Sequence, residues 1–153
     1  MADDIILNEE WVTSELARAI PTSYGYADVS IGRVVDGDLI GGVLYKEFTG
    51  ESIRMSVASF RDGWLSRNLL WAAFAYPFAQ LGCARVFSQI SEARPEALAF
   101  NLKLGFSEVL RLPGVYPGGV GVVVTKMERA ECRWLSIRQT YFVSSLPFAQ
   151  RVQ

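Results

Sequence analysis

Residues 52–81 read SIRMSVASFRDGWLSRNLLWAAFAYPFAQL, and this stretch decides the fold that we expect. It predicts a strand over Ser52–Ser59, a turn with the sequence R-D-G at 61–63, and a long apolar helix that starts near Trp64. The first N–H groups of such a helix have no partner within the helix and point toward one spot. Together with the helix dipole they form an anion site, so this stretch predicts a place for a phosphate-bearing ligand.

Three runs of sequence carry a resemblance to a known family. They are RDGWLSRNLL (61–70), AYPFAQLGCARV (75–86) and AFNLKLGF (99–106), and in this order they resemble the GNAT superfamily of N-acetyltransferases. The run MERAECRWL (127–135) is similar to small acetyltransferases encoded by bacteriophages. The resemblance spans residues 28–135, and its specificity lies in the order of the motifs.

The resemblance implies a mixed α/β (α+β) fold. Its sheet has six to seven mostly antiparallel strands, with a central parallel pair that splays apart and helices on both faces. We expect a GNAT-like acyltransferase domain over residues 1–135 and a tail, 136–153, that packs on the domain or on a partner subunit. The implied reaction moves an acetyl group from acetyl-CoA to an amine by direct attack.

Composition narrows the class of protein. The chain has 153 residues, a net charge of −1, two cysteines and no histidine. A length of this kind fits one domain, and the acidic balance argues against nucleic-acid binding. Without histidine or a C-x-x-C motif no zinc site is expected, and Cys83 and Cys132 are expected to be free, buried thiols. No signal peptide or membrane span is predicted, which favours a cytoplasmic protein.

The remaining elements follow from local signals. Asn8 is expected to cap a first helix that Pro21 stops, with Tyr24 and Tyr26 in the next loop either contacting substrate or packing on the surface. A D-G turn predicts a hairpin, and a helix between two strands predicts that they run parallel. The expected segments are strands 29–35, 39–48 and 84–90, a helix 95–104, and a final hairpin of 106–112 with 120–127.

The resemblance also assigns cofactor contacts. The backbone of residues 57–59 would pair with the pantetheine arm, and N–H groups of residues 63–67 would hold the pyrophosphate. The family motif begins with Arg or Gln, has Gly three residues later, and has Gly or Ala two residues after that. When its central Gly is aligned with Gly63, Phe60 and Leu65 occupy the flanking positions. When the alignment is shifted by one residue, Arg61 and Ser66 fit the flanking positions but Trp64 takes the place of the central Gly. The cofactor-binding candidates are Val57, Ala58, Ser59, Arg61, Gly63, Trp64, Leu65, Ser66, Arg67, Arg94, Asn101 and Lys103.

Proton transfer has fewer candidates. Many family members use a tyrosine as the acid, and Asn101 stands at that position here; an amide donates a hydrogen bond but cannot give up a proton. Glu47 and Glu92 are the candidate bases, because each ends a strand that borders the predicted cleft. A solvated surface position would also explain both glutamates, and catalysis by positioning alone is a further alternative.

Two other classes of function remain open at this stage. A GNAT-like domain without turnover would act as a binding or interaction module. Bulky residues that crowd the turn in either register, Asn101 at the place of the acid, and the apolar tail favour this alternative. Modification of a nucleobase is the third reading, and the sequence pI of about 5.5 argues against it. For the enzyme we expect an amine-bearing small molecule or protein as substrate, and a homodimer is one alternative for the assembly.

Overall fold

The structure is a computed structural model that describes residues 2–20 and 28–137. Its core is one seven-stranded sheet with the strand order β1-β2-β3-β4-β5-β7-β6. Every neighbouring pair is antiparallel except β4 with β5, which is parallel. The strands are β1 (Asp3–Leu7), β2 (Val29–Val35), β3 (Asp38–Lys46), β4 (Ser52–Ser59), β5 (Arg85–Ser91), β6 (Ser107–Tyr116) and β7 (Val120–Glu128).

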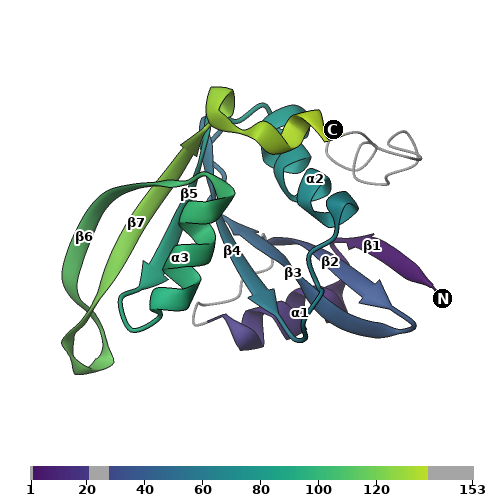
Figure 1. The fold of residues 1–153 in the computed structure, drawn as a ribbon, viewed down its shortest axis with the longest axis horizontal. Coiled ribbons are helices and arrows are strands. Elements are labelled where there is room, and N and C mark those ends of the chain that lie inside the picture. The colour runs from purple at the N-terminus through teal and green to yellow at the C-terminus, as the bar shows by residue number, and fades with distance from the viewer. Residues whose placement is uncertain (1, 21–27, 138–153) are drawn as a thin grey trace.

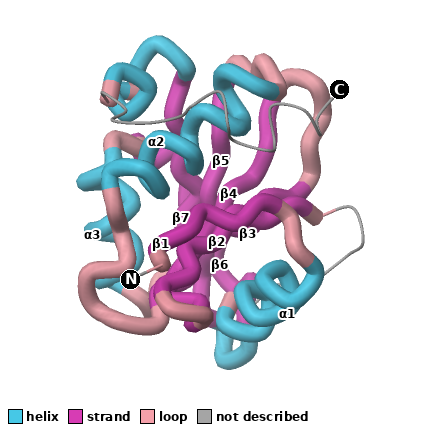
Figure 2. The backbone as a smooth tube through the Cα atoms, turned by 90° about the vertical axis from the view of Figure 1, so that its right-hand side faces the viewer, coloured by secondary structure: helices cyan, strands magenta, loops and turns pink. Residues whose placement is uncertain are grey.

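Helices lie on both faces of this sheet, as Figures 1 and 2 show. Helix α1 (Glu10–Ala19) covers one face, where its Leu16 packs against Leu44 and Ala58. Helices α2 (Arg67–Ala75) and α3 (Pro95–Leu104) cover the other face. This arrangement confirms the predicted fold class, including the single parallel pair at the centre.

The larger part of the core lies under α2. Phe74 and Phe78 are fully buried there, beside Val43 of β3 and Val86 of β5. Since β3 and β5 lie on opposite sides of β4 in the sheet, α2 packs on strands of both halves of the molecule. The continuation of α2 is a π-helical turn, Tyr76–Gln80, that begins next to Pro77. A proline removes one backbone donor and crowds the preceding turn, which accounts for the change of helix geometry here.

Local sequence signals located several boundaries correctly. The D-G turn joins β2 to β3 with φ of 50° at Asp36 and 87° at Gly37, the left-handed pair that a two-residue hairpin needs. Helix α3 begins at Pro95 and ends before Gly105, whose φ of 116° forms a left-handed cap.

The amino-terminal expectations were partly wrong. Residues Asp3–Leu7 form the edge strand β1, which pairs with β2 and which the sequence analysis did not predict. Asn8 is not the helix cap: it has a φ of 53° in the turn after β1, and its N–H donates to the Ser30 carbonyl at 2.7 Å. Glu9 takes the cap position without a side-chain bond. Tyr24, Tyr26 and most of the predicted tail lie outside the described residues.

The start of α2 was also predicted too early. The helix begins at Arg67, and Trp64 belongs to the extended segment before it. Ser66 caps the helix, because its hydroxyl accepts a hydrogen bond from the N–H of Leu69 at 3.1 Å. A serine three residues past the glycine was therefore a better start signal than the apolar run.

Candidate active site

The parallel strands β4 and β5 pair over three residues and then separate. Their register joins Ser52–Arg54 to Arg85–Phe87, and no pairing between them follows. Beyond that point β4 stays paired with β3 as far as Ser59, whereas β5 stays paired with β7 as far as Ser91. Each strand thus follows its own half of the sheet. The opening between them is the splay that the sequence analysis expected.

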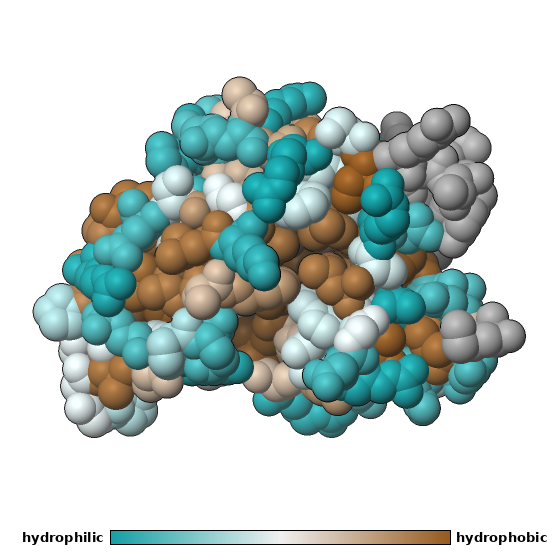
Figure 3. All heavy atoms as spheres, in the orientation of Figure 1, coloured by the Kyte–Doolittle hydropathy of each residue, from teal (hydrophilic) through white to brown (hydrophobic). Residues whose placement is uncertain are grey.

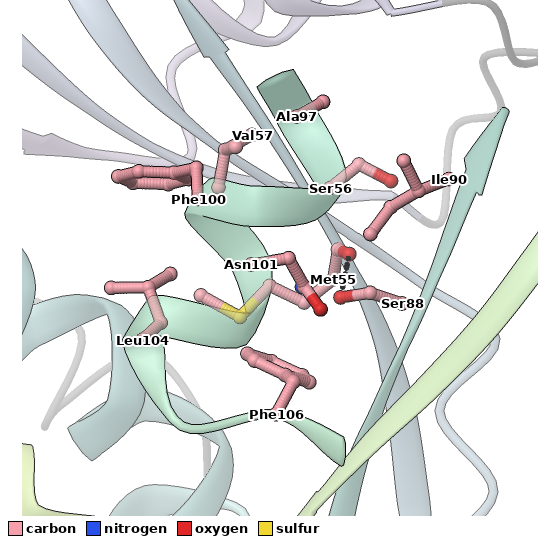
Figure 4. A pocket seen from close by; sticks show the side chains of 10 residues that line it. All are labelled: Met55, Ser56, Val57, Ser88, Ile90, Ala97, Phe100, Asn101, Leu104 and Phe106. Atoms are coloured by element: carbon pink, nitrogen blue, oxygen red, sulfur yellow. Dashed lines mark hydrogen bonds between the residues drawn. The ribbon is translucent and has the colours of Figure 1, made fainter. Parts of the chain in front are cut away.

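A small cavity lies at the closed end of this splay. Its volume is about 80 Å³, and its wall is mainly apolar. Figure 4 shows its lining side chains converging from β4, β5, α3 and the short connection that follows α3. They are Met55, Ser56, Val57, Ser88, Ile90, Ala97, Phe100, Asn101, Leu104 and Phe106. We call this space the inner cavity.

A wider cavity of about 330 Å³ lies at the open end of the splay, and we call it the outer cavity. It shares Val57, Ala97 and Phe100 with the inner cavity, so the two spaces are neighbours. The structure brings the predicted residues Val57, Ala58, Ser59, Trp64 and Arg94 to its wall, together with Ala19, Glu96, Ala97 and Phe100.

The turn between β4 and α2 forms one side of the opening. Gly63 adopts a φ of 77°, which a residue with a side chain rarely accepts. Because α2 starts at Arg67, the carbonyl of Ser66 accepts the N–H of Leu70 at 2.9 Å and its hydroxyl takes the N–H of Leu69. The first amides of the helix thus lie three residues later than predicted, and the serine hydroxyl occupies one of them.

An arginine on β2 fixes the same turn. The Nη1 of Arg33 donates to the carbonyl oxygens of Gly63 at 2.7 Å and of Trp64 at 2.9 Å. Its Nε and Nη2 form a two-pronged bond to the carboxylate of Asp3, both at 2.9 Å. That bond lowers the pKa of Asp3 and raises the pKa of Arg33. Sequence reasoning missed both residues, since nothing local marks them.

Trp64 packs beside the opening without closing it. The indole lies against Gly41 of β3, where an added Cβ would stand 2.5 Å from the Trp64 Cε3 atom. On its other side the ring contacts Phe100 of α3, with 5.9 Å between the ring centroids. A glycine is therefore needed at position 41, because the tryptophan side chain lies against its backbone. Leu65 instead packs against the main core.

A short polar row lies among the apolar walls of the inner cavity. The side-chain oxygen of Asn101 accepts a hydrogen bond from the Thr125 hydroxyl at 2.7 Å. The Ser88 hydroxyl donates to the Met55 carbonyl at 3.0 Å, directly after the last paired residues of β4 and β5 (Figure 4). Asn101, Ser88 and Thr125 are all buried. Sequence reasoning had singled out Asn101 but neither of the hydroxyl residues.

The two predicted bases are not brought to the cavity walls. Glu47 follows β3 at the closed end of the splay, where it forms an ion pair with Arg54 at 2.9 Å. The N–H of Glu92 donates to the Gly121 carbonyl at 2.9 Å, and its carboxylate lies 3.9 Å from Arg111. Neither glutamate lines the inner or the outer cavity.

Three predicted cations are exposed at different places. Arg61 lies in the turn after β4, and Arg67 is the first residue of α2. Lys103 lies in the last turn of α3, where its carbonyl accepts a bond from Arg133 at 2.8 Å. Arg94, which lines the outer cavity, stands 3.4 Å from Glu96. The structure therefore brings one of these four cations to a cavity wall.

The thiols lie away from these cavities. Cys83 is buried and Cys132 is half-buried, both are free, and burial raises the pKa of each thiol. Low thiolate content makes them poor nucleophiles. Within the described residues no group of three or more acidic, cysteine or histidine side chains could hold a metal ion. Nor does any helix of the described residues have the length and apolar character to cross a membrane.

Solved structures resemble this fold, although no family model and no curated protein sequence matches the chain. Mutant forms of the spermidine/spermine N-acetyltransferase SpeG from Vibrio cholerae align with a TM-score of 0.69 and 14% identity, over 84% of this chain and 96% of theirs. SpeG from Vibrio cholerae in complex with manganese ions gives 0.68 and 15%, over 82% and 92%. A putative phosphinothricin N-acetyltransferase gives 0.64 and 13%, over 83% and 98%.

These neighbours define the class of fold. The chain has the fold of the GNAT N-acetyltransferases, with the mostly antiparallel sheet and the single parallel pair in common. At identities of 13–15% the likeness concerns the fold, and function has to be argued from the site. The part of the resemblance that pointed to bacteriophage enzymes is not supported by these structures.

Proposed function

We propose that this protein is an N-acetyltransferase that moves an acetyl group from acetyl-CoA to an amine. The observation that carries the proposal is the splay between β4 and β5, with one narrow apolar cavity at its closed end and a wider one at its mouth. A long, flexible acyl carrier with a polar, anionic end fits such a shape. The three neighbours described above, all N-acetyltransferases by name, support the same reaction class.

The residues present fit the carrier in three ways. Residues 57–59 of β4 have no strand partner on the β5 side among the described residues. Their backbone groups on that side can therefore pair with the amides of a ligand. Arg94 supplies a cation at the mouth, where a phosphate would be attracted. Gly63 and the start of α2 form the turn beside it, where the Ser66 hydroxyl occupies the N–H of Leu69. When bound, acetyl-CoA supplies a thioester carbonyl carbon that the amine attacks directly, with cleavage of the C–S bond.

The chain's own residues act mainly by positioning. Trp64 and Phe100 form an aromatic wall of the outer cavity, against which a ligand can be held. Thr125 occupies the side-chain oxygen of Asn101, so the amide NH₂ is the group left to donate a hydrogen bond in the inner cavity. Because an amide cannot deliver a proton, water has to carry the proton from the attacking amine to the departing CoA thiolate. Holding two reactants in place can supply about 7 kcal/mol of the barrier or more.

Ligand binding tests the first half of the proposal. Acetyl-CoA at 100 times its dissociation constant should stabilise the native protein by about 2.7 kcal/mol and raise its melting temperature. Ala97→Phe places a ring where both cavities meet and should abolish the rise, because Ala97 lines both. Ala99→Phe is the matched control, since Ala99 lies on the same helix and is exposed; it should keep the rise.

Thiol release tests the second half. Purified protein with acetyl-CoA and a panel of amines, from polyamines to amino acids and peptides, should release free CoA with at least one acceptor. Binding without release would identify a GNAT-like module without turnover, and the enzyme proposal would be withdrawn. The absence of any melting shift in the unaltered protein would reject the cofactor itself.

A further inference from the structure

Among the described residues, the outermost strand of the sheet, β6, is paired on one side only. The strand order ends at β6, and residues 107–115 are all exposed. Four large apolar side chains lie on this strand, each between 43% and 50% exposed: Val109, Leu110, Leu112 and Val115. Figure 1 shows β6 at the outer edge beside β7, and Figure 3 shows hydrophobic surface gathered over these strands. An uncovered apolar edge strand is a template for pairing with another strand.

A bulge in β6 arranges its charges. Glu108 lies opposite Thr125 of β7 and Arg111 lies opposite Val123, whereas Val109 is skipped in the register. Thr125 and Val123 are two residues apart and share one face of the sheet, so Glu108 and Arg111 share that face as well. The pair is bonded at 2.9 Å, and Leu110 stands between them on the opposite face. Without the bulge the two charges would point to opposite faces.

This pattern is self-complementary. If a second copy of the strand runs antiparallel beside β6 with Leu110 at the centre, and Val109 is skipped in both copies as it is in the pairing with β7, Leu110 meets Leu110 of the second copy. Glu108 then stands opposite Arg111 of that copy, and Arg111 opposite its Glu108. Ser107 and Leu112 form the next pair outward. A twofold axis requires a surface that matches itself in this way, whereas an unrelated partner does not.

We propose that the segment 107–112 of β6, here called the β6 edge, is a docking surface for a second copy of this chain. The two edges pair antiparallel, the sheet continues through both molecules, and cross-strand pairs of Glu108 with Arg111 set the register. Pro113 lacks an N–H and ends the pairing segment. The exposed leucines become buried at the interface, which removes the apolar edge from water. This inference is independent of the acetyl-transfer reaction.

Charge reversal tests the pairing. The unaltered protein should be a dimer by sedimentation equilibrium or light scattering. Glu108→Arg and Arg111→Glu each place like charges opposite each other twice per dimer, so each variant alone should dimerise at least about tenfold more weakly. An equal mixture of the two variants should form heterodimers with nearly the original affinity, because every opposite pair is then attractive.

Mixing separates the proposal from a role within one chain. The Glu108–Arg111 bond inside each molecule is broken in both variants and cannot be repaired by adding the other variant. Glu15→Arg is the matched control, because it breaks the exposed Glu15–Arg18 pair, also three residues apart, on α1 away from β6. It should leave the dimer intact. Circular dichroism should show that all variants remain folded.

The dimerisation experiments can support or overturn the proposed pairing of the β6 edges. A monomeric unaltered protein, or a mixture that stays monomeric, overturns the proposal, and so does a dimer that survives both reversals. If a reversal fails to fold, Leu110→Lys serves instead, since Leu110 is 43% exposed and meets its own copy at the centre. That variant should be monomeric and should still bind acetyl-CoA if the proposed function holds, so failure of one proposal can be told from failure of the other.

Discussion

Backbone pairing is extensive within each half of the sheet and sparse between the two halves. Strands β1 to β4 form one antiparallel half, and β5, β7 and β6 form the other. Within each half the strands are paired along most of their length, as in the seven residue pairs that join β5 to β7. Between the halves, β4 and β5 share three residue pairs. Each half is thus a continuously paired sheet, and the proposed site lies where the two halves diverge.

Side-chain contacts form much of the connection between the two halves of the sheet. Ser88 of β5 donates to the Met55 carbonyl of β4, and Arg54 of β4 donates to the side chain of Gln89 of β5 at 2.9 Å. Trp64, packed on Gly41 of one half, contacts Phe100 of α3 next to the other. Side-chain contacts hold the strands near each other while leaving backbone groups of the opening for a ligand. A small set of side-chain contacts therefore holds the site open, and each can be tested by substitution.

The largest effect is expected where Trp64 meets Gly41. Gly41→Ala would place a Cβ 2.5 Å from the indole, and this overpacking should reduce the free energy of unfolding by about 1–3 kcal/mol. Urea denaturation measures the loss. In a Trp64→Leu background the same substitution should cost much less, because the ring that it strikes is gone. Equal costs in both backgrounds would show that Trp64 is not the cause.

A smaller effect is expected at the closed end of the splay. Ser88→Ala removes the donor to the Met55 carbonyl and should cost about 1 kcal/mol. It should also weaken acetyl-CoA binding if this bond positions the cavity wall. Ser56→Ala is the matched control, because Ser56 lines the same cavity and forms no side-chain hydrogen bond with the described residues. Equal stability of the two variants would contradict a clamping role for Ser88.

The smallest effect concerns the support of the turn, and it depends on pH. Arg33 holds the pKa of Asp3 below its usual value of 3.8, so the stabilisation is complete above that value and is lost as the pH falls through and below it. The pair is partly exposed, and Asp3→Asn should cost less than about 1 kcal/mol at neutral pH. Denaturation at several pH values should show this difference vanish in acid. Asp4→Asn, the neighbouring substitution in β1, leaves the Asp3–Arg33 pair in place and is the matched control.

Local patterns predicted most of the fold but the site only in part. Proline and glycine fixed both ends of α3, and the D-G pair fixed the hairpin between β2 and β3, because these residues restrict or free the backbone where they stand. The strand β1 was missed, since five residues beginning with two acidic ones give no strand signal by themselves. The apolar run after Gly63 concealed that Trp64 precedes the helix.

Some of the predicted site residues line the outer cavity and others do not, depending on whether chain order or side-chain orientation decides their position. Val57, Ala58 and Ser59 end a strand whose neighbour follows from chain order, and they do line the outer cavity. Glu47 and Glu92 also follow strands, yet they lie away from both cavities, because position along a strand does not say which edge or face a side chain occupies. Their role as bases stays a prediction that the cavity geometry does not favour.

The sequence by itself determined the elements after β1, their order and the single parallel crossover, because backbone preferences and hydrophobic patterns act over short distances along the chain. The tertiary structure decided where β4 and β5 separate, that Arg33 supports the turn from a distant strand, and that a bulge turns Glu108 and Arg111 to one face of β6. These are contacts between residues far apart in sequence, and their geometry exists only once the sheet has assembled.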